Sequence, residues 1–287
     1  MKQVSGSYAE PIAHHKQIID RVNIKQARRK LVRSLPGYKT LRRLRGSLKS
    51  RMHEARDARE VFLEHFQRNE WGSSESASGP GSTLEYTENI RKELPGLVEE
   101  LMVRTILDAP CGDYNWFRAI EWHSDIDYIG GDIVEPLIDG NRVKFEDQRT
   151  RFMVLNVIHD PLPVRDLWLC RDCLFHLSER DIFQSLANFT RSRIPYILTS
   201  NHPDCDVNID IPTGAFRQIN LTLPPFTLPP PLRVIDDWIE GYPPRHLALW
   251  GRESIADALS SNKTYLRLSE HAGSDVQTKA QPRKILR

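Results

Sequence analysis

The sequence predicts an α/β fold with a seven-stranded, mostly parallel sheet and helices on both faces, preceded by a basic helical extension. Three observations support this prediction. From about residue 104, short apolar runs alternate with amphipathic stretches. The first two runs each end in an acid, Asp108 and Asp132, which are 24 positions apart. Gly112 lies in a tight turn after the first acid, as in a βαβ unit that binds a nucleoside.

The expected elements follow the chain in order. Strands are predicted at 104–109, 127–132, 151–156, 166–171, 194–200 and 246–250. Helices are predicted at 84–103, 114–122, 134–147 and 178–191. Because helices and strands alternate, the strands are expected to run parallel, in a Rossmann-like arrangement.

The chain has 287 residues, and its N-terminal part is strongly basic whereas the remainder is acidic. Residues 1–60 contain 16 Lys/Arg and 5 Asp/Glu, about +11, and the remainder contains 24 and 33, about −9. We therefore predict a basic helical extension at 1–59, a main domain at 60–270 and a disordered tail at 271–287. Within the extension, 38–59 has an amphipathic helical pattern. It can pack on the main domain, on an anionic membrane surface or on a partner chain, and its charge also suits nucleic acid.

Composition indicates a cytoplasmic protein. There is no apolar run of about 18 residues and no signal-like N-terminal segment. The four cysteines are scattered and do not form a disulfide pattern. Cys170 and Cys173 are three positions apart, which on an extended strand places side chains on opposite faces, so we expect no metal site between them.

Several segments resemble the class I S-adenosylmethionine (SAM)-dependent methyltransferases. LDAPCGD resembles their first motif, although Pro110 and Tyr114 stand where further glycines are usual. WGSSESASGPGSTLEYT, LDAPCGDYNWF, DLWLCRDCLFHLS and TGAFRQINLTLPPFTLPPP resemble a bacterial group of these enzymes whose methyl acceptor is unassigned. The resemblance covers residues 60–255 and implies a Rossmann-like fold and SAM as cofactor.

The resemblance also implies which residues hold the cofactor. Gly112 allows close approach of the backbone, Asp108 orients the turn, and Asp132 accepts hydrogen bonds from the ribose hydroxyls. The simpler interpretations are an ordinary turn and a helix N-cap. Asn156 and the Val157 N–H are expected on the adenine, with Trp71 in a covering loop at 71–83 that can also be read as a linker. The full predicted set is Trp71, Asp108, Ala109, Gly112, Asp132, Ile133, Asn156 and Val157.

The chemistry is expected at the ends of the fourth and fifth strands. Asp172 is predicted to orient the acceptor or a cation, and His176 or His202 to act as general base. The alternatives are a helix cap for Asp172 and a packed core imidazole for His176. Asp172 with Asn201 and Asp204 partly resembles a Mg²⁺ site, but a metal is not the favoured interpretation.

The predicted activity is transfer of a methyl group from SAM to a small polar acceptor, a hydroxyl oxygen of a sugar or glycan-like molecule. An insertion at 203–245 is expected on the acceptor side, as a lid or as a surface hairpin. One alternative is a methyltransferase for RNA or another macromolecule, tethered by the basic extension. A second is a non-catalytic protein that keeps the fold for binding alone. The sequence does not predict the oligomeric state.

Overall fold

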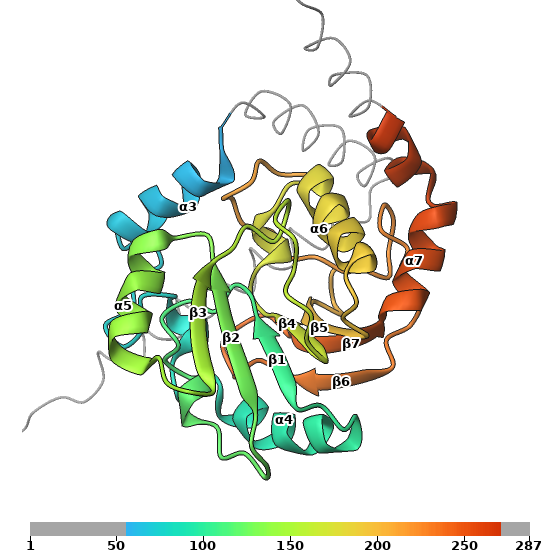
Figure 1. Ribbon diagram of the computed structural model, residues 1–287. Coiled ribbons are helices and arrows are strands. Elements are labelled where there is room, and N and C mark those ends of the chain that lie inside the picture. Colours follow the sequence, from blue (N-terminus) through green and yellow to red (C-terminus); the bar gives the residue numbers. More distant parts are fainter. Residues whose placement is uncertain (1–55, 271–287) are drawn as a thin grey trace, which may run out of the picture. The chain divides into compact units, whose positions relative to one another are not determined.

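The computed structural model describes residues 56–270, and its centre is a seven-stranded sheet in the order β3-β2-β1-β4-β5-β7-β6 (Figure 1). The strands are β1 (Thr105–Asp108), β2 (Asp127–Asp132), β3 (Thr150–Val154), β4 (Leu167–Cys170), β5 (Tyr196–Asn201), β6 (Arg233–Asp236) and β7 (His246–Gly251). Strands β1 to β5 are parallel, and β7 is antiparallel to both β5 and β6. The predicted mostly parallel sheet is therefore confirmed.

Helices cover both faces of this sheet. They are α3 (Ala58–Gln67), α4 (Glu88–Glu100), α5 (Glu135–Phe145), α6 (Glu179–Arg191) and α7 (Arg252–Ser261). Successive strand residues point to opposite faces. Leu107 and Trp168 accordingly pack with buried residues of α6 and α7, whereas Ile106 and Leu167 pack with those of α4 and α5. The two apolar clusters fix the sheet and leave the carboxyl ends of β1, β2 and β4 free to form a site.

Two elements differ from the prediction. The expected helix at 114–122 is only a 3₁₀ turn at Phe117–Ala119, because Tyr114 has a left-handed backbone with φ of 60°. Its ring packs with Phe117, Tyr128, Phe145 and Phe152, beneath the turn that follows β1. Strand β6 was not predicted, since three of its four residues are exposed and it carries no apolar alternation.

The cysteines also differ from the prediction. All four are free and buried. Cys170 and Cys173 lie in the same core cluster and their thiols are hydrogen-bonded to each other, so the expectation of opposite faces is wrong. The reason is that β4 ends at Cys170 and the chain then turns at Asp172, whose φ is 55°.

The predictions for the basic extension before residue 56 and for the tail at 271–287 lie outside the described residues. Within 56–270, no helix combines the length and apolar character that a membrane span requires. The first described helix, α3, has its first turn capped by the Asp57 carboxylate.

Candidate active site

A cavity of about 390 Å³ opens at the carboxyl ends of β1, β2 and β4, beneath α3 and the 71–83 loop. It is lined by every predicted site residue except Ala109, namely Trp71, Asp108, Gly112, Asp132, Ile133, Asn156, Val157, Asp172, His176 and His202. Ala109 is fully buried, and its N–H and C=O are both bonded to β4, through Leu169 O and Trp168 Nε1. It therefore supports the turn from below.

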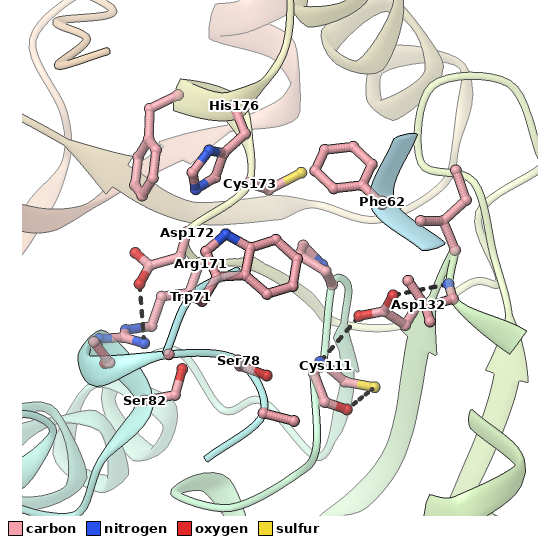
Figure 2. A pocket seen from close by; sticks show the side chains of 18 of the residues that line it. Phe62, Trp71, Ser78, Ser82, Cys111, Asp132, Arg171, Asp172, Cys173 and His176 are labelled. Carbon is pink, nitrogen blue, oxygen red and sulfur yellow. Dashed lines mark hydrogen bonds and ion pairs between the residues drawn. The ribbon is translucent and has the colours of Figure 1, made fainter. Parts of the chain in front are cut away.

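Asp132 joins the end of β2 to the turn after β1. Its Oδ2 accepts a hydrogen bond from Gly112 N at 3.1 Å, and its Oδ1 accepts one from Val134 N at 3.0 Å (Figure 2). Burial raises the pKa of Asp132 to about 6, and the backbone N–H bonds oppose that shift. Each carboxylate oxygen retains capacity to accept a further hydrogen bond, so the pair suits a vicinal diol.

The turn after β1 requires glycine because the covering loop touches it. Gly112 has φ of 56°, and a Cβ there would lie 2.0 Å from Ser78 Oγ. Next to it, Asp113 accepts hydrogen bonds from Ser76 Oγ at 2.9 Å and from Ala77 N at 2.8 Å. The 71–83 loop is thus fastened across the cavity. Asp113 was not among the predicted site residues.

The end of β3 forms one wall of the cavity. Asn156 Oδ1 accepts from Ile158 N at 3.0 Å, which shapes the turn that carries Val157. In the described part of the chain, no hydrogen bond uses the Val157 N–H. Together with the apolar side chains of Val134 and Leu137, this wall offers a flat apolar surface with a backbone donor at its edge.

Asp108 lies deep in the cavity at the end of β1. Tyr128 donates its hydroxyl to Asp108 Oδ2 at 2.9 Å. Burial raises the pKa of Asp108 to about 8, while the Tyr128 hydrogen bond and the charge of Arg171 oppose the shift. A cation bound nearby would favour the ionised form of this carboxyl group.

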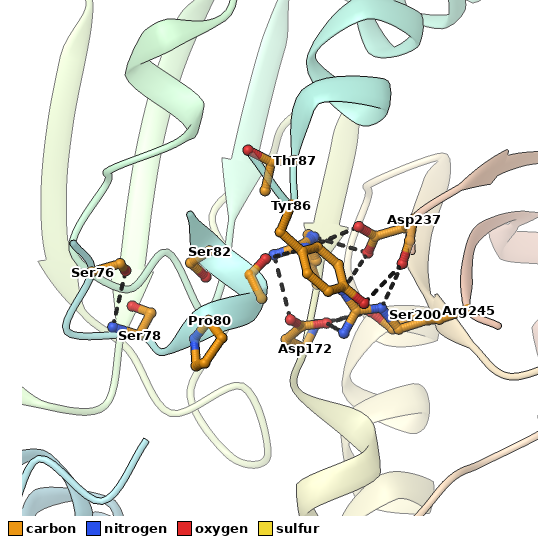
Figure 3. A network of polar contacts seen from close by, with 12 residues as sticks. Ser76, Ser78, Pro80, Ser82, Tyr86, Thr87, Asp172, Ser200, Asp237 and Arg245 are labelled. Atoms are coloured by element: carbon orange, nitrogen blue, oxygen red, sulfur yellow. Dashed lines mark hydrogen bonds and ion pairs between the residues drawn. The ribbon is translucent and has the colours of Figure 1, made fainter. Parts of the chain in front are cut away.

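Two arginines and two aspartates form a buried network beside β4. Arg171 Nε and Nη2 donate to the two oxygens of Asp237 at 3.0 and 2.9 Å. Arg245 lies between the two acids, with Nη1 2.8 Å from Asp172 Oδ1 and Nη2 3.0 Å from Asp237 Oδ2 (Figure 3). Arg171 Nη2 also donates to Gly81 O of the covering loop at 2.6 Å. None of these roles for Arg171, Asp237 or Arg245 was predicted.

Asp172 is held in the charged form by this network. Burial alone would raise its pKa, but the Arg171 and Arg245 guanidiniums outweigh burial, and the pKa lies below its usual value. The Ser200 hydroxyl donates to Asp172 Oδ1 at 3.1 Å. The Asp172 carboxylate faces the cavity, and a quarter of the Asp172 side chain is exposed. Figure 2 shows Asp172 and His176 on the side of the cavity opposite Asp132, with Trp71 between them.

The two histidines each present Nε2 to the cavity, but in different protonation states. His176 Nδ1 lies 3.0 Å from Ala215 O, and because a carbonyl only accepts, Nδ1 carries the proton and Nε2 is the free acceptor. His202 Nδ1 instead accepts from Ile219 N at 3.3 Å, so its Nε2 carries the proton and is a donor. Burial lowers the pKa of each to about 4, which keeps both rings neutral.

Among residues 56–270, no group of three or more His, Cys, Asp or Glu side chains has an arrangement that could hold a metal ion. Neither Asn201 nor Asp204 lines the cavity, and Asn201 Oδ1 accepts from Leu221 N at 2.7 Å. Of the three residues that partly resemble a Mg²⁺ site in the sequence, Asp172 alone lines the cavity, and Asn201 and Asp204 do not join it there.

Comparison with known proteins gives matches only to solved structures. No protein-family model and no curated protein matches the sequence. A SAM-dependent methyltransferase from Leishmania major superposes with a TM-score of 0.53 and 11% identity, covering 70% of this chain and 89% of that one.

Two further structures are less similar. Magnesium protoporphyrin IX methyltransferase from Synechocystis PCC 6803, with S-adenosylhomocysteine (SAH) bound, has a TM-score of 0.49 and 11% identity over 68% of this chain and 100% of that one. The 1,6-didemethyltoxoflavin-N1-methyltransferase from Burkholderia thailandensis has a TM-score of 0.48 and 16% identity, covering 67% and 86% of the two chains. At these identities the likeness concerns the fold.

The strand order and the Leishmania likeness together assign the Rossmann-like fold of the class I methyltransferases. In open α/β sheets, ligands bind at the carboxyl ends of the strands, where the order of strands reverses. In this chain that position lies between β1 and β4, and the cavity is there. The residues present also fit an adenosyl group, with a carboxylate at Asp132 that can accept from a diol, a turn at Gly112 that lines the cavity, and an apolar wall near Val157.

Proposed function

We propose that this protein is a SAM-dependent methyltransferase that acts on a hydroxyl oxygen of a small molecule. One observation carries the proposal. A single cavity combines a carboxylate fixed by the N–H groups of Gly112 and Val134 with a second carboxylate and a free imidazole nitrogen at its other side. The first group suits a nucleoside, and the second suits an acceptor that must lose a proton.

The chain supplies binding and orientation for the cofactor. Asp132 is assigned to the ribose hydroxyls and the Val157 N–H to the adenine ring. Asp108 is assigned to the ammonium group, whose charge would hold this carboxyl group ionised although burial raises its pKa to about 8. SAM, when bound, supplies an electrophilic methyl group on its sulfonium.

The remaining groups act on the acceptor. His176 Nε2 is assigned to accept the hydroxyl proton, because its Nδ1 is already committed to Ala215 O. Asp172 keeps its charge beside two guanidiniums and is assigned to orient the acceptor. Trp71 and the loop fastened through Asp113 exclude water from the reacting groups.

A small acceptor is supported by the cover over the cavity. Phe62 and Trp71 line it from α3 and the 71–83 loop, which narrows the space for a macromolecule. The alternative of an RNA or protein substrate depends on the basic extension, most of which lies outside the described residues. A cytoplasmic location stays a prediction from the sequence.

The proposal is tested by calorimetric titration of the full chain with SAM and with SAH, with NADH as the control ligand. We expect micromolar binding of both adenosyl compounds and none of NADH. Binding of NADH alone, or of none of the three, would overturn the proposal. The non-catalytic alternative is separated by incubating the SAM-loaded protein with acceptors and measuring SAH formation.

A further inference from the structure

We infer that the methyl acceptor is a neutral, planar aromatic compound with a phenolic hydroxyl, not the sugar that the sequence suggested. The inference rests on the proposed methyltransferase activity and specifies its substrate class. Three features of the acceptor side of the cavity carry it. They are the shape of its walls, the small number of polar groups still available, and the balance of charge.

The walls of the acceptor side are aromatic rings. The ring centroids of Phe175 and His176 are 4.6 Å apart, and those of Phe175 and Phe216 are 5.4 Å apart at an interplanar angle of 78°. Trp71 lines the same cavity and packs against His65 of α3 at 5.6 Å. A flat ring gains edge-to-face and stacking contacts in such surroundings.

Phe216 is the least protected of these rings. It remains 60% exposed although it lines the cavity, whereas Phe175 behind it is 3% exposed. Because it lines the cavity and remains exposed, the Phe216 ring is available for contact with an apolar ligand. Gly214 allows this position, because with φ of 94° it brings the segment carrying Phe216 against Val61 of α3.

Few polar groups remain to receive a sugar. Asp172 is already bonded to Ser200 and paired with Arg171 and Arg245. The His202 Nδ1 accepts from Ile219, which leaves one donor on that ring and one acceptor, Nε2, on His176. A sugar would bring several hydroxyls into this space, and a buried hydroxyl without a hydrogen-bond partner is destabilising. A phenol brings one.

The charges of the network cancel. Arg171 and Arg245 balance Asp172 and Asp237, and the guanidiniums are already paired with the two acids. This network therefore offers no unpaired guanidinium to a carboxylate or phosphate on the acceptor. The exposed Asp172 carboxylate would repel such groups, so the acceptor is expected to enter as a neutral molecule.

The chemistry of the base agrees with a phenol. Burial lowers the pKa of His176 to about 4, so its ring is a weak base. A phenol has a pKa of about 10, and water or an aliphatic hydroxyl is a far weaker acid, with roughly a million-fold less of its anion present. In the step itself the phenolic oxygen bonds to the methyl carbon, the C–S bond breaks with its electron pair going to sulfur, and the proton passes to His176 Nε2 and then to solvent.

The test compares acceptors of similar size on the SAM-loaded full chain. Phenol, cresols and hydroxyquinolines are set against glucose, rhamnose and glycerol, and SAH and the methylated product are measured by mass spectrometry. We expect turnover with the aromatic hydroxyls and none above background with the sugars. SAM binding with turnover of sugars only, or with no turnover of any phenol, would overturn the inference while leaving the cofactor assignment intact. Failure to bind SAM would overturn the proposed function itself.

A matched pair of variants tests the wall. Phe216→Ala removes the exposed ring and is expected to raise the KM for the phenol at least about tenfold, with SAM affinity unchanged within about twofold. Leu232→Ala is the control, because Leu232 is 53% exposed and does not line the cavity. Equal KM values for both variants and the parent would contradict the role of Phe216. A matching loss of SAM affinity would assign the ring to the cofactor instead.

Discussion

Replacement of Asp132 by alanine is expected to weaken SAH binding by on the order of 1–3 kcal/mol, or about 5- to 150-fold. The magnitude follows from the geometry. The two carboxylate oxygens each accept one backbone N–H, from Gly112 at 3.1 Å and from Val134 at 3.0 Å, and each can accept one ribose hydroxyl in addition. Each charge-assisted hydrogen bond contributes roughly 1.5–3 kcal/mol, part of which water recovers in the variant.

The same substitution also frees the two backbone N–H groups, so loss of affinity alone does not identify the ribose contact. The assay is therefore a double-mutant cycle by calorimetry, with SAH and an analogue that lacks the ribose hydroxyls. We expect the analogue to bind parent and variant with similar affinity. Asp139→Ala is the control, because Asp139 is exposed on α5, where it pairs with Arg142, and does not line the cavity. An equal loss for SAH and the analogue would refute the contact between Asp132 and the ribose.

Three further predictions concern the turn, the network and the histidine. Gly112→Ala is expected to open the covering loop, because the added Cβ would collide with Ser78 and alanine is disfavoured at a φ of 56°. We expect faster proteolysis at 71–83 and weaker SAH binding, and an unchanged proteolysis rate and SAH affinity would contradict this prediction. Asp237→Ala leaves the buried guanidiniums of Arg171 and Arg245 short of a partner, and it is expected to lower the free energy of unfolding in denaturant by about 3–5 kcal/mol. A decrease of less than about 1 kcal/mol would show that the network is not needed for stability. His176 has a folded pKa of about 4, below its usual 6.5, so its contribution to stability is present above pH 6.5 and is lost as the pH falls towards 4. As the pH falls through that window, His176→Gln should lose less free energy of unfolding than the parent, by up to roughly 1.4 kcal/mol per pH unit. The variant is compared with the parent because Asp108 and Asp132 titrate with the opposite sign in both proteins. Parallel curves of unfolding free energy against pH would contradict the prediction.

The sequence predicted the parts of the site that depend on local order. Asp108, Asp132, Asn156 and Asp172 stand at or just beyond the ends of consecutive parallel strands, and such ends meet at one edge of the sheet whatever the rest of the chain does. The spacing of Asp108 and Asp132 was sufficient because one short crossover separates β1 from β2. All the strands except β6 were predictable because they are short apolar runs with turn residues between them.

The parts that were missed depend on contacts distant in sequence. Arg171 meets Asp237 66 positions later, and Asp237 follows β6, an exposed edge strand without an apolar pattern. Nothing near Asp113 indicates the serines that it binds more than thirty positions earlier. The wrong expectation for Cys170 and Cys173 has a local cause, since extended geometry was assumed past the residue where β4 ends. The left-handed backbone conformation of Asp172 cannot be predicted from the amino-acid composition of this segment.

The missed contacts explain how the two sides of the cavity are connected. The covering loop touches the turn after β1 through Ser78, whose Oγ accepts from Asp113 N at 3.2 Å, and touches the ion network through Gly81 O, which accepts from Arg171. A Cβ on Gly81 would lie 3.0 Å from Asp172 Oδ2, so the loop also limits where that carboxylate can lie. Only two residues separate Ser78 from Gly81, and so short a segment cannot shift at one end without moving the other. Ordering of the loop at the Asp132 side therefore fixes Asp172 and Arg171 at the acceptor side.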